Sequence, residues 1–444
     1  MTEREFAIEV VQKLRDAGFQ ALWAGGCVRD ELLGLSPDDY DVATDATPEQ
    51  VRKLFKRTIA VGMIFGVIEV LGPPAEKGYL KVQVATFRSD VSYSDGRRPD
   101  EVVFSTARED AERRDFTING MFFDPLERQL IDYVGGQTDL QARVLRAIGD
   151  PVQRFTEDKL RMLRAVRFAT RFELTVDPAT MDAIRAMAPK ITVVSAERIA
   201  DELRKLLVSP HRARGMRLLD ETGLAAVLLP EVLPMKNLPQ GLPSAPTGNL
   251  WEHTLRVLEL LGPEATFPLA FAALLHDVGK PRVVGRTPDR YTFYQHEHVG
   301  RRLASEIGLR LKLSNQERDR IEWLVEKHQY LADSPRMRPS KLKQTLIHSG
   351  IQELLALHRA DALASDRSVD HVEYCEKLLS EWSDADLNPP PLLTGYDLMR
   401  HGLEQGPDFK RLLDSVREAQ LDGAITTPEE ALEMVNRLAE EGAE

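Results

Sequence analysis

Two aspartates, Asp39 and Asp41, stand one residue apart in the segment "SPDDYDVATD". On an extended chain, residues i and i+2 point to the same side, so both carboxylates would face one point while Tyr40 faces away. Like charges at short range disfavour each other, and their hard oxygen donors suit Mg²⁺ held jointly with a triphosphate. A solvated acidic loop would have the same residues, so the pair alone leaves both interpretations open.

A glycine pair lies upstream of these aspartates. Gly25 and Gly26 follow the apolar run "ALWA" and precede "VRDELLG", which predicts a strand, a tight turn and a helix. Glycine lets a backbone approach a ligand, and the amides at a helix N-terminus favour phosphate. Structural turns use the same pattern, so the glycines by themselves are weak evidence for a phosphate site.

The bulk properties restrict the class of protein. A chain of 444 residues is too long for one compact core, and it has no apolar run of the length that a membrane helix needs. Its start, "MTEREFAIEVVQKLRDAGF", predicts an amphipathic helix rather than a secretion signal. Cys27 and Cys375 have no metal-type spacing and fit a reducing compartment. We therefore expect a cytoplasmic, multi-domain protein with no membrane segment.

Charge is distributed unevenly. The net charge of −12 argues against non-specific nucleic-acid binding by the whole surface. Arginines nevertheless cluster between Arg97 and Arg171, whereas the C-terminal stretch "PEEALEMVNRLAEEGAE" is acidic. This asymmetry predicts a basic cleft on an acidic body.

The elements that would position these residues change in type along the chain. Strand-like runs such as "ALWAGG", "VIEVLG", "LKVQVATF" and "QLIDYVGG" fill residues 20–135, whereas later segments have apolar residues at helical spacing. Stretches rich in Pro and Gly interrupt the helical part at 236–249 and 387–393. We predict an α/β head over 1–145, a helical neck and body over 146–240, a helical region over 241–387 and a helical tail over 388–444.

The combination of motifs adds to these patterns. "GGCVRD" followed by "DYD" resembles the signature of the nucleotidyltransferase superfamily related to DNA polymerase beta, and more closely that of the class II tRNA nucleotidyltransferases. This family comprises the CCA-adding enzymes and their bacterial poly(A) polymerase relatives. "RRDFTINGMF", "DYVGG", "EDKLRMLRAVRF" and "SAERIADELRKLL" resemble its further motifs, in the family's order. The resemblance implies a polymerase-beta-like mixed sheet in the head, a mostly α-helical remainder, and a structural role for the last motif.

The resemblance also implies roles for single residues. Asp39 and Asp41 would be the catalytic residues and hold Mg²⁺. The residues expected to contact the triphosphate and ribose are Gly25, Gly26, Arg29, Arg113, Arg114, Asp115 and Asn119. Many relatives have a third acidic residue where this chain has Gln83, so either two carboxylates suffice or another, such as Glu69, takes that place.

The family selects its bases with an acidic residue and an arginine, which align with Asp158 and Arg161, followed by Arg164 and Arg167. On a helix, positions 158, 161 and 164 would form a slanted row within reach of one ligand. A carboxylate beside a guanidinium complements the amine donor and ring-nitrogen acceptor that cytosine and adenine share. A solvated helix face with ion pairs would have the same residue types. The apolar stripe Leu160, Leu163 and Val166 turns the charged row away from the core, and the motif's place in the family's order favours the template.

A segment between the first two motifs, "TFRSDVSYSDGRRPDEVVF", resembles the family's flexible loop, with Arg88, Asp95, Arg97 and Arg98 as its candidate residues. Relatives that add only CC tend to have this loop shortened, and here it is complete. A plain turn with surface arginines is the alternative interpretation.

The activity that the resemblance implies is template-independent addition of CCA to the 3′ end of tRNA from CTP and ATP, by two-metal nucleotidyl transfer. The body would hold the tRNA acceptor arm through its shape and its phosphates. An A-adding, CC-adding or poly(A) polymerase activity remains the alternative.

A second group of residues could do separate chemistry. His and Asp residues recur along the helical region, at His253, His276, Asp277, His296, His328 and Asp361. The adjacent His276-Asp277 pair resembles the signature of HD phosphohydrolases, and the set could bind a transition-metal ion or Mg²⁺. This leaves a competing interpretation, in which the chain is mainly a metal phosphohydrolase. The tail resembles that of many bacterial relatives, and it suggests helices without catalytic residues.

Overall fold

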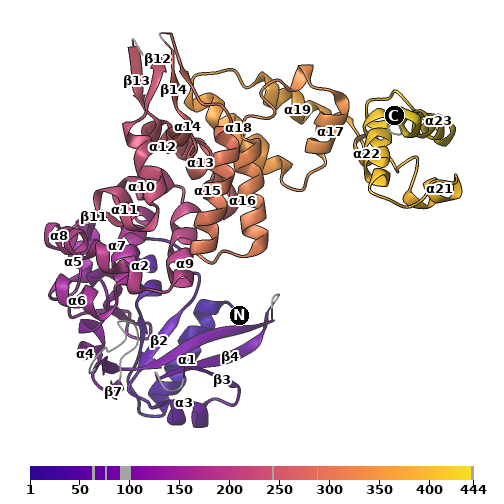
Figure 1. Cartoon of the computed structure of the whole chain (residues 1–444). Coiled ribbons are helices and arrows are strands. Elements are labelled where there is room, and N and C mark those ends of the chain that lie inside the picture. The colour runs from indigo at the N-terminus through magenta and orange to yellow at the C-terminus, as the bar shows by residue number, and fades with distance from the viewer. Residues whose placement is uncertain (63–65, 76–77, 91–101, 243–244, 288, 442–444) are drawn as a thin grey trace. The chain divides into compact units, whose positions relative to one another are not determined.

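The structure, a computed structural model, describes residues 1–62, 66–75, 78–90, 102–242, 245–287 and 289–441. Its internal contacts divide the chain into two compact units, Met1–Pro230 and Glu231–Glu444, which are described separately below (Figure 1).

The first unit begins with the expected α/β head. The described residues form a sheet with the strand order β3-β4-β5-β2-β1-β8-β9. The pairing of β2 with β5 is parallel, and the other pairings in this sheet are antiparallel. The strands are β1 Ala21–Ala24, β2 Asp41–Thr44, β3 Thr58–Gly62, β4 Val67–Ala75, β5 Gly78–Thr86, β8 Met121–Asp124 and β9 Gln129–Asp132.

Burial follows the sequence pattern of these strands. β1 is buried along its whole length, as expected for a short apolar strand in the middle of a sheet, whereas β5 alternates exposed and buried residues until it reaches its end. Helix α1 (Glu3–Asp16) begins with a capping box at Thr2 and packs its apolar face on the sheet. This packing fixes the central strands, and thereby the start of β2 where the aspartates lie.

Helices make up most of the remainder of the first unit. They are α2 Gly26–Leu32, α3 Pro48–Leu54, α4 Ala107–Glu112, α5 Gly136–Gln141, α6 Pro151–Glu157, α7 Leu160–Arg171, α8 Pro178–Met187, α9 Ala196–Leu207, α10 Arg212–Glu221 and α11 Leu224–Leu228. Two short strand pairs accompany them: β6 Arg88–Asp90 with β7 Val102–Phe104, and β10 Val144–Leu145 with β11 Thr175–Val176. Ser195 is the N-cap residue of α9 but makes no side-chain cap hydrogen bond.

The motif "DYVGG" forms a rigid turn. The Asp132 carboxylate accepts hydrogen bonds from the four backbone amides of residues 134–137. Gly136 leaves no room for a side chain, because a Cβ there would lie 2.2 Å from the carbonyl oxygen of Thr117. The turn therefore packs directly against the segment "RRDFTINGMF" and holds it beside the sheet.

The second unit is mostly helical. Its helices are α12 Leu250–Leu260, α13 Phe267–Leu275, α14 Lys280–Val283, α15 His296–Arg310, α16 Asn315–Lys327, α17 Pro339–Leu346, α18 Ile351–Ala364, α19 Asp370–Glu381, α20 Asp384–Leu387, α21 Gly395–Arg400, α22 Asp408–Leu421 and α23 Pro428–Glu441. Its short hairpins are β12 Pro239–Leu242 with β13 Ala245–Asn249, and β14 Gly285–Arg286 with β15 Tyr291–Thr292.

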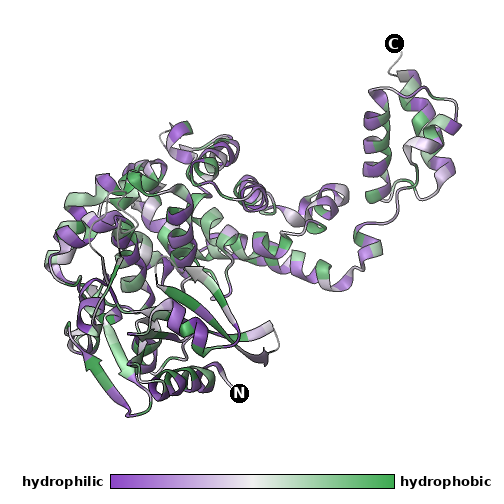
Figure 2. Cartoon of the chain, turned by 90° about the horizontal axis from the view of Figure 1, so that it is seen from below, coloured by the Kyte–Doolittle hydropathy of each residue, from purple (hydrophilic) through white to green (hydrophobic). Residues whose placement is uncertain are grey.

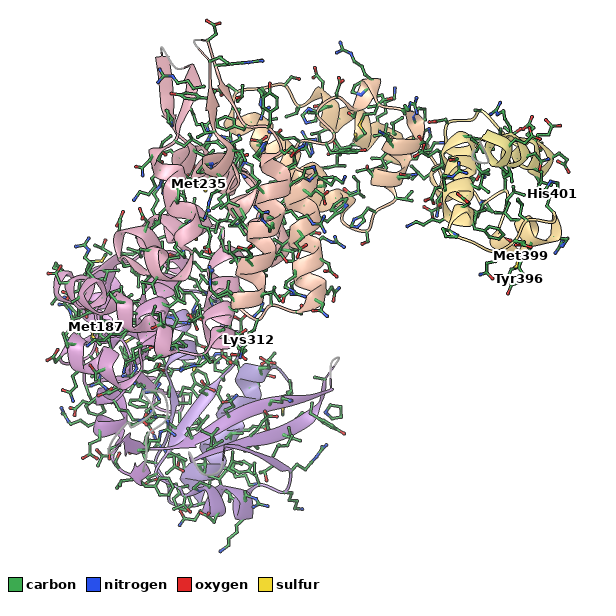
Figure 3. All side chains as sticks on the ribbon, viewed as in Figure 1. Met187, Met235, Lys312, Tyr396, Met399 and His401 are labelled. Carbon is green, nitrogen blue, oxygen red and sulfur yellow. The ribbon has the colours of Figure 1, made fainter. Side chains whose placement is uncertain are left out.

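The tail has a small apolar core of its own, centred on Leu398, Leu412 and Val435. Figure 2 shows the corresponding periodicity as green and purple faces along its helices. Tyr396 and Met399 lie at the surface of α21 (Figure 3).

The contact pattern places its single division at Pro230, ten residues before the boundary predicted at 240. The boundaries near 145 and 388 stay predictions. Among the described residues, no helix combines the length and the apolar character needed to cross a bilayer.

Candidate functional sites

A cleft of about 560 Å³ lies within the first unit. It brings together Asp39 and Asp41 with all the residues predicted to bind nucleotide: Gly25, Gly26, Arg29, Arg113, Arg114, Asp115, Asn119, Asp158, Arg161, Arg164 and Arg167. These residues come from positions 25 to 167, so only the fold makes them neighbours. The cleft is the predicted basic one, since arginine is its most frequent lining residue.

The two aspartates stand at the start of a strand. Asp41 is the first residue of β2, and Asp39 lies in the preceding loop, which corrects the expectation that both belong to one strand. Tyr40 anchors the loop because its hydroxyl donates to the Glu31 carboxylate at 2.8 Å and its buried ring packs on Trp23. Both carboxylates are thereby left facing the cleft.

Asp41 has an unusual titration. Burial, and then the neighbouring charge of Asp39, raises the pKa of Asp41 to about 6, although the cation of Arg114 opposes the shift. A pair of carboxylates that is disfavoured in this way is stabilised by a cation. The chemistry of the donor set therefore fits a divalent metal ion that prefers oxygen ligands.

Neither Gln83 nor Glu69, the two positions considered for a third metal ligand, is among the described residues that line the cleft. Gln83 pairs with Asp41 across the parallel strands, and Glu69 pairs with Gln83 on the next strand. Glu69 forms an ion pair with Lys81 at 3.0 Å, and it is absent from the residues that line the cleft. Among the described residues, Asp39, Asp41, Asp115 and Asp158 are the carboxylates of this cleft.

The glycine turn has the geometry that the sequence predicted. Gly25 is the N-cap of α2 with φ of 72°, a conformation that favours glycine. A Cβ there would also lie 2.7 Å from a guanidinium nitrogen of Arg114. Arg29, one turn into α2, is buried and bonds to Asp30 and to the side-chain oxygen of Asn119 at 2.6 Å.

The segment "RRDFTINGMF" is held by ion pairs whose carboxylates, Asp110 and Asp115, are buried. Asp110 accepts from both Arg113 and Arg114, one guanidinium on each carboxylate oxygen. Asp115 accepts from Arg164 on α7 at 2.8 Å and from Asn119 at 3.0 Å. Burial opposes the ionisation of Asp115, but Arg164 and the hydrogen bond from Asn119 outweigh it and hold the pKa of this carboxyl below its usual range.

The predicted base-selecting row needs a correction. Asp158 is not on the helix of Arg161: it ends α6 with extended backbone, and its carboxylate accepts from Arg198 at 2.7 Å and from the amide of Leu160. Arg161 pairs with Glu157 at 2.5 Å instead. The helical row over 158–164 is therefore wrong as a geometry, although Asp158 and Arg161 both line the cleft.

Arg167, the last of the predicted base-selecting arginines, packs between helices. It is 8% exposed and donates to the buried Glu202 of α9 at 2.5 Å, so it joins two helices. Its guanidinium also lies 4.0 Å from the ring centre of Phe168. This arginine has a packing role even though it reaches the cleft.

Sequence reasoning missed four lining residues: Leu160, Phe168, Arg171 and Arg198. Arg171 stands seven residues after Arg164, so helical spacing could have identified it. Phe168 has Arg164, one helical turn earlier on α7, at 5.1 Å and Arg29 of α2 at 5.3 Å from its ring centre; helical spacing predicts the first of these cation–π contacts but not the second. Arg198 comes from the motif that we considered purely structural.

The loop residues are only partly described. Arg88 begins β6 and its carbonyl accepts a hydrogen bond from Arg113, but it does not line the cleft. Asp95, Arg97 and Arg98 lie outside the described residues.

The second unit brings all six predicted His and Asp residues together. Asp277 lies at the centre: one carboxylate oxygen is 3.3 Å from Nε2 of His276, and the other is 3.4 Å from Nε2 of both His296 and His328. His253 completes the first group and contacts Asp361 at 3.1 Å. The cluster thus has two sets of three ligand atoms that share Asp277.

Backbone contacts orient these histidines. Nδ1 of His276, His296 and His328 each contacts a carbonyl three residues upstream, at 2.7–2.8 Å, so each Nε2 points into the cluster. Gly279 allows α15 to approach, because a Cβ there would lie 2.1 Å from the carbonyl oxygen of His296. Histidine ligands oriented in this way are typical of metal sites.

Two buried atoms support the same interpretation. Nε2 of His276 and Oδ1 of Asp277 have no hydrogen-bond partner among the described residues. Burial opposes ionisation of Asp277, yet the charges of His276 and Lys280 hold the pKa of this carboxyl well below its usual range. A metal ion would satisfy both orphaned atoms, so the residues present fit one.

The sheet, the glycine turn and the carboxylate pair that faces an arginine-rich cleft define a nucleotidyltransferase of the polymerase-beta type. Residues 21–146 match the poly(A) polymerase head domain, residues 173–235 match the probable RNA and SrmB binding site of polymerase A, and residues 250–366 match the HD domain.

Full-length relatives agree with these matches. The chain is 34% identical to the A-adding tRNA nucleotidyltransferase of Deinococcus radiodurans over 95% of its length and 96% of the relative's. It is 30% identical to the CCA-adding enzyme of Levilactobacillus brevis over 97% of its length and 96% of that enzyme's. A solved structure of the CCA-adding enzyme of Bacillus stearothermophilus with CTP has a TM-score of 0.75 and 28% identity, covering 100% of this chain and 99% of that one. The chain belongs to the tRNA nucleotidyltransferase family.

Replacing Asp41 should reveal the cost of its ionisation. Asp41→Asn is expected to stabilise the metal-free chain at pH 7.5 by ~1–3 kcal/mol, because the charged carboxyl is disfavoured by burial and by Asp39. The folded-state pKa of about 6 lies above the ordinary 3.8, so the wild type should lose stability relative to Asp41→Asn as the pH rises between these values. Below pH 3.8 this difference in stability should disappear. Urea unfolding with a chelator, across this pH range, measures the difference.

The matched control is Asp38→Asn, which changes an exposed aspartate that does not line the cleft. It should show no pH-dependent gain. A stability difference between Asp41→Asn and wild type that stays constant with pH would contradict the assignment.

Proposed function

We propose that this chain adds CCA to the 3′ end of tRNA, using CTP and ATP. The single observation that carries the proposal is the cleft, in which a glycine turn, two carboxylates and an arginine-rich helix converge. The CCA-adding relative that matches the whole chain adds weight. A cytoplasmic location, where tRNA is available, fits this activity.

A-adding activity is the second candidate for the same site, because a full-length A-adding relative is 34% identical. The two activities share the transfer chemistry and differ only in which nucleotides are accepted on which tRNA end. The cleft residues named above are common to both proposals.

Asp39 and Asp41 would hold Mg²⁺ in the cleft. When bound, this metal would supply charge neutralisation for the triphosphate and for the leaving pyrophosphate. The chain's own contribution is placement: the amides around Gly25 and Gly26 and the cation of Arg114 form a phosphate-binding surface beside the carboxylates. No covalent intermediate with the protein is needed.

Base selection would use the groups at the junction of α6 and α7. Asp158 supplies an acceptor and Arg161 a donor on the cleft wall, which matches the edge shared by cytosine and adenine. In the structure Asp158 pairs with Arg198, and Arg161 pairs with Glu157. A nucleotide that replaced one of these contacts would exchange one charge-assisted bond for another, whereas guanine or uracil would leave a buried group unpaired.

An incorporation assay tests this activity. Transcripts of one tRNA that end before CCA, after C and after CC are each incubated with one labelled nucleotide and Mg²⁺. We expect incorporation of CTP on the first two transcripts and of ATP on the third. If the only incorporation is that of ATP on the third transcript, the activity is A-adding. Asp41→Ala should reduce kcat/KM by ~1,000-fold or more, since a lost metal ligand removes several kcal/mol of transition-state stabilisation.

The control is Asp38→Ala, which should retain activity because Asp38 directly precedes Asp39 but does not line the cleft. Incorporation of no nucleotide by the wild type, or full activity in Asp41→Ala, would contradict the proposal.

We also propose a metal-dependent phosphohydrolase site in the second unit. The observation that favours it is the set of imidazoles whose Nε2 atoms converge on Asp277. A cluster rich in histidine favours a transition-metal ion over Mg²⁺, which prefers oxygen ligands. Such an ion would supply a Lewis acid for phosphate ester hydrolysis.

Metal analysis tests this site. The wild-type chain, loaded with Mn²⁺ and desalted, should retain the ion, and Asp277→Asn should lose most of it because both ligand sets share this carboxylate. His298→Ala, an exposed histidine outside the cluster, is the control. Hydrolysis of 2′,3′-cyclic nucleotides is the activity readout, and a wild-type chain that retains no metal and hydrolyses no ester would contradict the proposal.

A further inference from the structure

A cavity of about 320 Å³ opens beside the histidine cluster. His328 and Asp361 belong to both the cluster and the cavity wall, so a molecule in the cavity would touch the cluster directly. We propose that this cavity binds the phosphate group of a small phosphate ester, with Arg367 as the residue that grips the anion. The inference rests on the phosphohydrolase site proposed above and names the cavity and the residue that would hold the phosphate of its substrate.

Arg367 is placed by the end of helix α18. Asp366 adopts a left-handed conformation with φ of 52°, the amide of Asp366 donates to the carbonyl of Leu363, and the amide of Arg367 donates to that of Ala362 at 2.8 Å. This is the double hydrogen-bond pattern that ends many helices, although glycine is the usual residue at the left-handed position. It turns the chain back so that Arg367 stands beside Asp361, which lies more than one helical turn upstream.

The guanidinium of Arg367 has capacity for a ligand. Its Nη2 donates to Oδ2 of Asp361 at 2.7 Å, while Oδ1 of the same carboxylate faces His253. The arginine side chain is 55% exposed and lines the cavity. Because a guanidinium has five N–H donors in a planar fork, it can hold Asp361 and still present a second edge to a phosphate oxygen.

The rest of the wall is rich in hydrogen-bond donors. Gln329, Ser368 and His371 contribute an amide, a hydroxyl and an imidazole. Among the described lining residues, Asp361 is the one carboxylate, and it is already paired with Arg367. Such a wall suits an anion with several acceptor oxygens better than it suits a cation.

The size of the cavity restricts the ligand. Its volume lies near the lower end of the ~300–1,000 Å³ usual for ligand pockets. It would admit a mononucleotide or the terminal phosphate of an RNA strand, but not an RNA duplex. These two sources present the same chemical group, and the experiment separates them.

Calorimetry on the full, chelator-treated chain measures this site without metal chemistry. Titration with adenosine 3′-monophosphate should give a site that is weakened ~10-fold or more in Arg367→Gln, because a charge-assisted hydrogen bond contributes ~1.5–3 kcal/mol. Arg367→Lys should recover part of the affinity, since it restores charge without the fork. Arg359→Gln is the control: this arginine lies on α18, pairs with Glu376 and does not line the cavity.

A parallel titration with an RNA oligonucleotide that ends in a 3′-phosphate distinguishes the sources. If Arg367→Gln weakens binding of both the mononucleotide and the oligonucleotide, the site accepts any accessible phosphate terminus. If it weakens binding of the mononucleotide alone, the site is specific for small esters. Equal binding by wild type and Arg367→Gln would overturn the proposal. If Arg367→Gln lost both Mn²⁺ retention and binding of the phosphate ligand, the proposal would also be overturned. Arg367 would then act only by positioning Asp361.

The two proposals for this unit can fail separately. Binding that depends on Arg367, in a chain that hydrolyses no ester, removes the phosphohydrolase and leaves the anion site. Ester hydrolysis with the same KM in Arg367→Gln and wild type does the reverse.

Discussion

The buried carboxylate of Asp115 is the contact on which the geometry of the cleft depends. It joins the segment "RRDFTINGMF" of the head to α7 through Arg164, and it continues through Asn119 to Arg29 in the helix after the glycine turn. Charges that are buried together must be paired and hydrogen-bonded, because a lone buried ion is strongly destabilising. The three segments are therefore held in one arrangement, and the carboxylates of the head face the arginines of α7 across a fixed space.

Much of this arrangement could be predicted from the sequence. The glycine turn, the Asp39–Asp41 pair and the order of motifs identified the wall of the cleft, and the spacing of apolar residues predicted the α/β head and the helical remainder. The six His and Asp residues of the second unit were also identified as one group, because the His276-Asp277 pair resembles the signature of HD phosphohydrolases and the other four recur along the same helical region. These features depend on local patterns, which a sequence expresses directly.

The errors arose where a local pattern and a tertiary contact compete. A helix through Asp158 satisfied the spacing of "EDKLRMLRAVRF", but its carboxylate accepts from the amide of Leu160 and pairs with Arg198, so the helix is interrupted between α6 and α7. Arg167 continues the row of arginines in the sequence, yet Glu202, 35 residues away, holds it within the helical packing. Phe168 lines the cleft beside Arg29, which comes from α2, and no spacing rule anticipates that contact.

The central claim is that side chains at the start of α7 choose the base while the head supplies the transfer chemistry. The most direct test is the ratio of kcat/KM for CTP over UTP on tRNA that lacks its terminus, and for ATP over GTP on tRNA that ends in CC, in wild type and Arg161→Ala. The account predicts that both ratios fall by an order of magnitude or more while the affinity for the triphosphate changes little. Unchanged ratios in an active Arg161→Ala enzyme would contradict it.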